Sequence, residues 1–191
     1  MIERFLRPPQ AAAGWVADGI RLFGLLSVAA GFVWWSPVDA GILALSLPAL
    51  VVPRFVGVRP AFDIVFGATV LVAVWSNVLD LYTSVAGWDL VVHFACTGVM
   101  AAMAYLALAR LDLVPAPDAE RTRPATAVVV VTAFGLGLSA VWEMAEWVGK
   151  AFVDPTIFVT YQDTIGDMAA GGLGGFAAGV VVARVRLLER D

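Results

Sequence analysis

Residues 142–147 read Trp142-Glu143-Met144-Ala145-Glu146-Trp147. This stretch places two carboxylates inside an apolar run over residues 125–151, which otherwise has the composition of a membrane-spanning helix. An ionised acid near the centre of a bilayer costs roughly 2.5–3.5 kcal/mol on insertion scales, so such an acid indicates a functional site with a polar partner. The stretch therefore predicts both the class of the fold and the place where its chemistry lies.

The composition of the whole chain is that of a helical membrane protein. Of its 191 residues, 61% are hydrophobic and 15% are charged, whereas soluble domains are about half apolar and about a quarter charged. Several apolar runs approach the roughly 20 residues that a helix needs to cross a bilayer. We predict an all-α polytopic bundle that forms one domain over residues 1–191, with six spans at about 12–35, 38–55, 61–81, 89–110, 125–151 and 163–184.

The segment 38–55 is short and is interrupted by Pro48, so it could be re-entrant, but the distribution of basic residues supports six crossings. Basic residues of short loops stay in the cytoplasm. With six spans and a cytoplasmic N-terminus, Lys150 alone lies outside, and the inside set is Arg4, Arg7, Arg54, Arg59, Arg110, Arg121, Arg123, Arg184, Arg186 and Arg190. We therefore predict that both termini are cytoplasmic. No basic cluster indicates nucleic acid as a partner.

The first span carries Asp18 and Arg21, which lie three residues apart and share one helix face. We expect both to lie near the inner interface, with Arg21 extending towards the lipid headgroups. A buried ion pair is the alternative.

Two other spans begin with an acid and carry a second polar residue four positions later. The helical rise of about 1.5 Å per residue places His93 and Asp167 about 6 Å below the outer surface, with Glu146 near that level and Glu143 one turn deeper. Residues three or four apart share a helix face. Three helices thus offer six candidate ligands at matching depth: Asp89, His93, Glu143, Glu146, Asp163 and Asp167.

Five carboxylates gathered without a cation would repel one another, and a divalent metal ion would remove that repulsion. Oxygen ligands with one imidazole suit Mn, Fe, Zn or Mg. We predict that the metal ligands are His93, Glu143, Glu146 and Asp167, and that Asp89 and Asp163 are catalytic, orienting ligands or acting as a base. The bound ion would activate water or polarise a substrate oxygen, which predicts a metal-dependent membrane enzyme for a lipid or envelope substrate.

Other readings of the same residues stay open. Asp89 and Asp163 are also typical helix N-caps, and the remaining acids could be protonated and hydrogen-bonded between helices. The first alternative function is a small transporter whose acids relay protons or bind a cation. The second is a structural membrane protein with a buried polar network.

The last span continues from Asp167 with a glycine at every fourth position, namely Gly171, Gly175 and Gly179. Such a stripe of small residues lets a neighbouring backbone approach closely. We expect it to pack against the fourth or fifth span and so bring Asp167 within reach of the other ligands. A dimer face, and hence a homo-oligomer, is the alternative. The apolar outer loop 153–162 is a candidate lid over the site.

The order of these motifs resembles the YjdF-type family of bacterial inner-membrane proteins. The resemblance rests on three motifs: Trp88-Asp89 with His93-Phe94 and Gly98, Trp142-Glu143 with Glu146-Trp147, and Asp163-Thr164 with Asp167-Met168 before a glycine-rich run. It implies a small multi-pass protein of the cytoplasmic (inner) membrane without an assigned activity. The acid-to-histidine opening of one helix and the acid-led final helix are also similar to VanZ-like membrane proteins.

Overall fold

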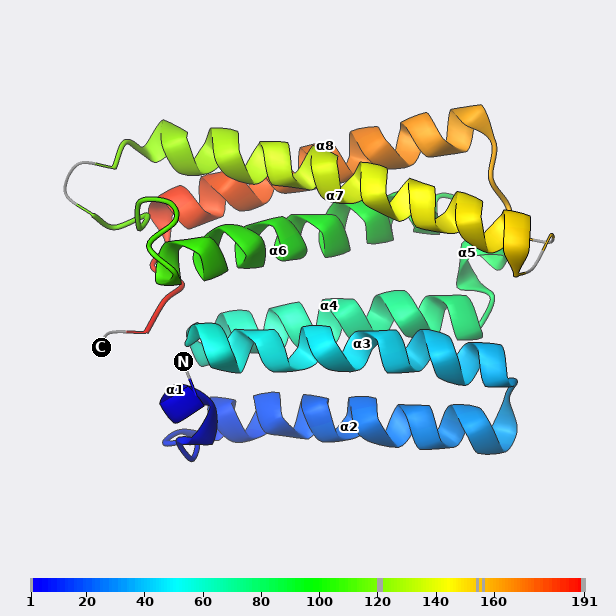
Figure 1. Ribbon diagram of the computed structural model, residues 1–191, viewed down its shortest axis with the longest axis horizontal. Helices are drawn as coiled ribbons and strands as arrows, with labels where there is room; N and C mark the ends of the chain where they lie inside the picture. The colour runs from blue at the N-terminus through cyan, green and yellow to red at the C-terminus, as the bar shows by residue number, and fades with distance from the viewer. Residues whose placement is uncertain (1, 120–121, 154, 156, 190–191) are drawn as a thin grey trace. The chain divides into compact units, whose positions relative to one another are not determined.

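The computed structural model describes residues 2–119, 122–153, 155 and 157–189, and these residues are mostly helical (Figure 1). The helices are α1 (Ile2–Leu6), α2 (Ala12–Trp34), α3 (Pro37–Val56), α4 (Pro60–Val78), α5 (Leu81–Ser84), α6 (Trp88–Arg110), α7 (Pro124–Phe152) and α8 (Tyr161–Arg184). Over the same residues the only β-pairing is an isolated bridge between Val58 and Leu188. The prediction of an all-α fold is confirmed.

Six of these helices are long and apolar enough to cross a membrane: α2, α3, α4, α6, α7 and α8. Their bounds lie within three residues of the predicted spans. The chain is therefore a multi-pass membrane protein, and the lipid bilayer is its environment. The orientation of the termini stays a prediction, and two of the basic residues behind it, Arg121 and Arg190, lie outside the described residues.

The doubtful second span is a continuous helix of 20 residues. Ser36 and Asp39 begin it with a reciprocal capping box, in which each side chain accepts a hydrogen bond from the other's backbone N–H. Gly57 ends it in the left-handed conformation at φ 71°, which glycine adopts without strain. The interior of the helix contains Pro48 and Pro53. Each proline lacks a backbone N–H and so removes one hydrogen-bond donor from a helix whose two ends are well formed.

The chain divides into two compact units, which we describe separately. Unit 1 comprises residues 1–86 and 187–191, and unit 2 comprises residues 87–186. In unit 1, α2, α3 and α4 pack against one another (Figure 1). The segment after α8 returns to this unit, where Leu187 accepts a hydrogen bond from Arg59 N–H at 2.7 Å and Glu189 N–H donates to Gly57 at 3.0 Å. The single domain expected from the sequence stays a prediction.

Unit 1 contains an ion-pair network between its helices. Arg21 binds both carboxylate oxygens of Asp63 at 2.6 and 2.7 Å, and it also donates to Asp18 at 3.0 Å. Arg54 of α3 is a second partner of Asp18. The Arg21 Nε donates to the Leu50 carbonyl at 3.0 Å, in the turn that precedes Pro53. Asp18 and Arg21 therefore form the ion pair that was the alternative, with Asp63 of α4 as a further acid on Arg21. Their expected depth near the inner interface stays a prediction.

Unit 2 is a bundle of α6, α7 and α8, in which α8 packs closely against both neighbours (Figure 1). A Cβ added at Gly174 would lie 1.9 Å from the Phe94 carbonyl oxygen of α6, and one at Gly175 would lie 3.0 Å from the Gly135 Cα of α7. Side chains at these positions would separate the helices. The glycine stripe thus packs within the unit, as expected, and this packing accounts for the stripe without a dimer interface.

Candidate functional site

The start of α6 positions the first two polar residues of the site. Gly87 precedes the helix at φ 74°, and Asp89 lies in the first turn without capping it. Negative charge is favourable there because the helix N-terminus carries a partial positive charge. One turn later, the buried His93 places its Nε2 3.4 Å from Asp89 Oδ1. The spacing of four residues therefore brings acid and imidazole together on one face, as predicted.

Glu143 of α7 meets the other side of the same imidazole. Its Oε1 lies 3.9 Å from His93 Nδ1. The neighbouring Trp142 ring packs edge-on against the imidazole, with ring centroids 5.7 Å apart. Because Glu143 is only 5% exposed, its carboxylate lies inside the unit and does not face lipid.

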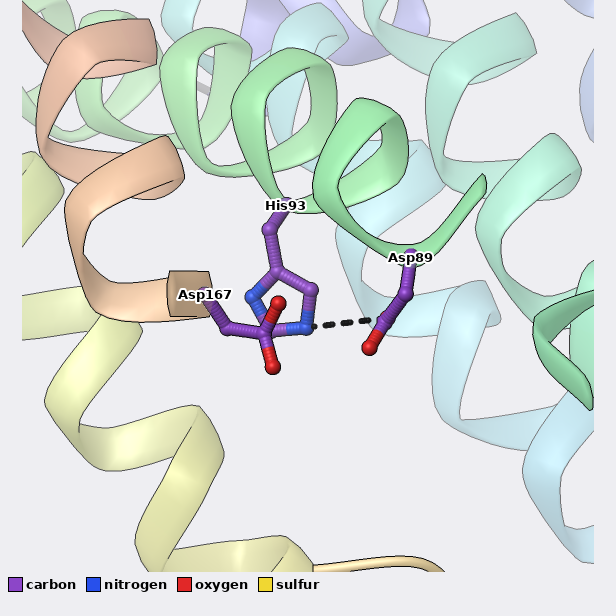
Figure 2. Close-up of side chains that lie close together, drawn as sticks. All are labelled: Asp89, His93 and Asp167. Carbon is purple, nitrogen blue, oxygen red and sulfur yellow. Dashed lines mark ion pairs between the residues drawn. The ribbon is translucent and has the colours of Figure 1, made fainter. Parts of the chain in front are cut away.

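Asp167 of α8 completes the group from the third helix (Figure 2). It is 1% exposed. One ligand atom from each of Asp89, His93 and Asp167 lies within 4.8 Å of the others, a grouping that could hold a metal ion. The close glycine contacts of α8 explain this approach, because they let the Asp167 backbone lie beside both neighbouring helices.

The buried acids are incompletely satisfied. Neither carboxylate oxygen of Glu143 has a hydrogen-bond partner among the described residues, and neither does Asp167 Oδ2. Leaving a buried polar atom unpaired costs about 1–3 kcal/mol, and more for a charged group. The site therefore has three buried oxygens that a bound cation or water would satisfy.

Three of the predicted site residues are not in the group whose ligand atoms lie within 4.8 Å of one another: Glu143, Glu146 and Asp163. The Glu146 carboxylate accepts a hydrogen bond from Trp142 Nε1 at 2.7 Å. Asp163 lies in the first turn of α8, and its backbone N–H donates to the capping Thr160 hydroxyl at 3.3 Å. Neither Asp89 nor Asp163 is therefore an N-cap. The roles predicted for Glu146 as a ligand and for Asp163 as a catalytic residue stay predictions.

Sequence reasoning overlooked Ser139, which is fully buried beside the site. Its hydroxyl donates to the Asp167 carbonyl at 3.4 Å and would lie 1.9 Å from a Cβ at Gly171. The available signal was its position four residues before Glu143, on the same helix face. Ser139 thus links α7 to α8 at the level of Asp167.

The proposed lid lies partly outside the described residues, since Asp154 and Thr156 are not among them. Two described residues of the loop, Ile157 and Val159, lie against the end of α7. Lys150 Nζ donates to the Val159 carbonyl at 3.1 Å, and a Cβ at Gly149 would lie 3.0 Å from Ile157 Cδ1. These contacts attach the loop to α7, and its role as a lid stays a prediction.

Comparison with known proteins gives one match. The model of the family described as "Predicted membrane protein (DUF2238)" matches residues 18–187. No curated protein and no solved structure matches the chain. The VanZ-like similarity has no counterpart among these findings.

Proposed function

The chain belongs to the DUF2238 family of predicted membrane proteins, the YjdF-type family that its motifs indicated, and on this premise we propose that it is a metal-dependent enzyme of the bacterial inner membrane. Its acid/histidine cluster, defined as Asp89, His93, Glu143 and Asp167, would bind one divalent metal ion. The substrate would be a lipid or another envelope molecule that reaches the cluster from the bilayer. The predicted topology, with cytoplasmic termini, would place the cluster near the outer face.

The observation that carries this proposal is that buried carboxylate oxygens, which lack hydrogen-bond partners among the described residues, lie close to the imidazole of His93. Three ligand atoms lie within 4.8 Å of one another, and the buried carboxylate oxygens of Glu143 have no hydrogen-bond partner among the described residues. Ligands about 2.1 Å from a tetrahedral metal ion are about 3.4 Å apart. Atoms at the 4.8 Å limit would therefore need to approach one another by about 1.4 Å, through rotation of their side chains.

The two nitrogens of His93 face different acids, and this gives the chain's own residues distinct roles. When one imidazole nitrogen ligates a metal, the other donates to a carboxylate that fixes the ring. Asp89 faces Nε2 and Glu143 faces Nδ1, so one would orient the ring while the other lies beside the ion. A bound divalent ion supplies a polarised water or substrate oxygen. The acid that lies beside the ion would accept the proton released there.

Metal analysis of the purified full-length chain tests the binding step. After loading with Mn²⁺, Zn²⁺ or Mg²⁺ and desalting, we expect one ion per chain in the wild type, and loss of that ion in Asp167→Asn and His93→Ala. The control is Asp112→Asn, because Asp112 is exposed at φ 57°, a conformation that asparagine tolerates. A metal-free wild type, or full occupancy in Asp167→Asn, would rule out the metal site.

Proteoliposome assays test the enzymatic step. We expect metal-dependent cleavage of a lipid substrate by the wild type and none by Glu143→Gln, with Glu3→Gln, an exposed residue of α1, as the matched control. Stoichiometric metal without cleavage of any envelope lipid would contradict the enzyme and leave a metal-binding protein.

A second candidate, a proton- or cation-coupled transporter, is favoured by the sequence of acids along α7. Glu146 is partly exposed, and the predicted topology places it one helical turn closer to the outer surface than the buried Glu143. Glu143 in turn faces His93. Such a series resembles the relays of acids and histidines in membrane pumps. Proton flux into proteoliposomes that is lost in Glu143→Gln and independent of metal would favour transport. Substitutions that change only thermal stability would favour a structural network.

A further inference from the structure

Unit 1 contains a cavity of about 280 Å³ that the acid/histidine cluster does not share. Its wall is formed by the segment leading from α1 into α2, the end of α3, the start of α4 and Glu189 of the returning tail. These helix ends are the places where spanning segments leave the hydrocarbon layer. The cavity therefore lies at the depth of lipid headgroups, on the side predicted to be cytoplasmic.

The charges around this cavity favour an anion. Three arginines line it, Arg4, Arg7 and Arg54, together with the acids Asp63 and Glu189. Arg54 pairs with Asp18, and Asp63 pairs with Arg21. Counted over the described lining residues, three arginines and two acids give a formal charge of +1, which attracts an anionic group.

Several contacts fix the wall that carries Arg4 and Arg7. The Phe5 ring stacks on Phe55, with centroids 4.4 Å apart and ring planes 8° apart. Arg54 donates to the Phe5 carbonyl at 2.9 Å and to the Arg7 carbonyl at 2.6 Å. A Cβ at Gly14 would lie 2.9 Å from Pro9 Cβ. The segment before α2 is therefore held against α2 and α3, which positions its arginines in advance of any ligand.

We infer that this cavity binds the phosphate group of an anion, supplied by the headgroup of an anionic phospholipid. A guanidinium matches a phosphate with two parallel hydrogen bonds. Basic pockets between membrane helices on the cytoplasmic side bind phospholipid headgroups in this way. The volume is slightly below the ~300–1,000 Å³ of pockets that enclose drug-sized ligands, so it suits a headgroup with its acyl chains outside. The exposed Ile2 and Leu6 of α1 offer those chains an apolar neighbour.

Lipid binding to the purified full-length chain in neutral detergent tests this inference. The probes are phosphatidylglycerol, phosphatidylcholine as the lipid without net charge, and inorganic phosphate, with adducts counted by native mass spectrometry. We expect saturable binding of phosphatidylglycerol that exceeds phosphatidylcholine, and a weakening of at least about tenfold in Arg4→Gln/Arg7→Gln. The Arg4→Lys/Arg7→Lys variant should retain part of the affinity, because lysine keeps the charge but loses the two-bond geometry.

The control separates this cavity from general attraction between basic residues and anionic lipid. Arg123→Gln/Arg184→Gln removes two exposed arginines of unit 2 and should leave phosphatidylglycerol binding unchanged. Equal weakening in both double variants, or equal binding of the two lipids, would overturn the inference. Inorganic phosphate that displaces phosphatidylglycerol supports the shared phosphate chemistry. Phosphate that binds while phosphatidylglycerol does not would overturn the lipid as the source.

Discussion

In unit 1 the guanidinium of Arg21 lies between the carboxylates of Asp18 and Asp63, whereas in unit 2 the buried oxygens of Glu143 and Asp167 lack hydrogen-bond partners among the described residues. Both sets of charges lie within helices long enough to span a membrane. Removing charges from water carries a large cost in both places. Unit 1 offsets that cost with its own arginines, whereas in the described part of unit 2 the neighbour of the buried acids is an imidazole, that of His93.

The difference between the two units separates a structural network from a candidate site. A network in which every acid has a guanidinium holds α2, α3 and α4 together and leaves no acid oxygen in need of a ligand. A cluster of acids around one imidazole has spare acceptors that a cation can satisfy. Substitutions in the ion-pair network of Arg21 should therefore change stability, whereas substitutions in the acid/histidine cluster should change ligand binding as well.

The largest effect is expected for Arg21→Met, which removes the cation between two acids. Taking one partner from a buried ion pair costs about 3–5 kcal/mol, and Arg21 and Asp63 are each only 14% exposed at the side chain. Thermal or denaturant unfolding in detergent measures the loss. The double variant Arg21→Met/Asp63→Leu should recover much of it, and no recovery would show that Arg21 acts through some other contact.

Metal should stabilise unit 2 by the next largest amount. A ligand that binds only the folded state adds about 2.7 kcal/mol at 100 times its Kd. Unfolding of the wild type should therefore shift upward with added divalent metal and shift back with chelator, while Asp167→Asn should not respond. An equal response in both proteins would place the metal elsewhere.

Gly174→Ala should cost about 1–3 kcal/mol, the usual range for overpacking. The new Cβ would lie 1.9 Å from the Phe94 carbonyl oxygen, so α6 and α8 must move apart. Metal affinity should fall with stability, because Asp167 and His93 lie on these two helices. Gly137→Ala is the matched control, since nothing lies within 4 Å of its Cβ position; similar losses in both variants would refute a specific helix contact.

The smallest effect is expected for Asp118→Asn, which removes an exposed ion pair. Asp118 lies 3.5 Å from Arg186, and the two side chains are 49% and 40% exposed. Pairs of this kind contribute less than about 1 kcal/mol. Unfolding should shift little, and the shift should vanish at high salt. A loss of stability as large as that of Arg21→Met would show that buried and exposed ion pairs do not differ in their contribution.

The spans, and the matching level of His93 and Asp167 along their helices, could be predicted because each depends on one helix at a time. Hydropathy and caps set where α6 and α8 begin, and counting residues from those starts placed His93 and Asp167 at the same level. What could not be predicted was which faces meet. Arg21 pairs with Asp63 because α2 and α4 present those faces to each other, and no periodicity within α2 contains that information.

Glu143 and Glu146 show the same limit within a single motif. Three residues turn an α-helix by about 300°, so the two side chains point about 60° apart. One lies beside His93, while the other accepts a hydrogen bond from Trp142. The sequence predicted that both acids face inward, but the choice between them depends on the rotation of α7 about its own axis.

The hydrogen bonds from Arg59 to Leu187 and from Glu189 to Gly57 also bear on the order in which parts of the chain complete their structure during synthesis. Residues 1–86 leave the ribosome first, yet the strand-like bridge at Val58 requires Leu188, which is translated after all of unit 2. The earliest part of the chain to be synthesised is thus among the last to be completed.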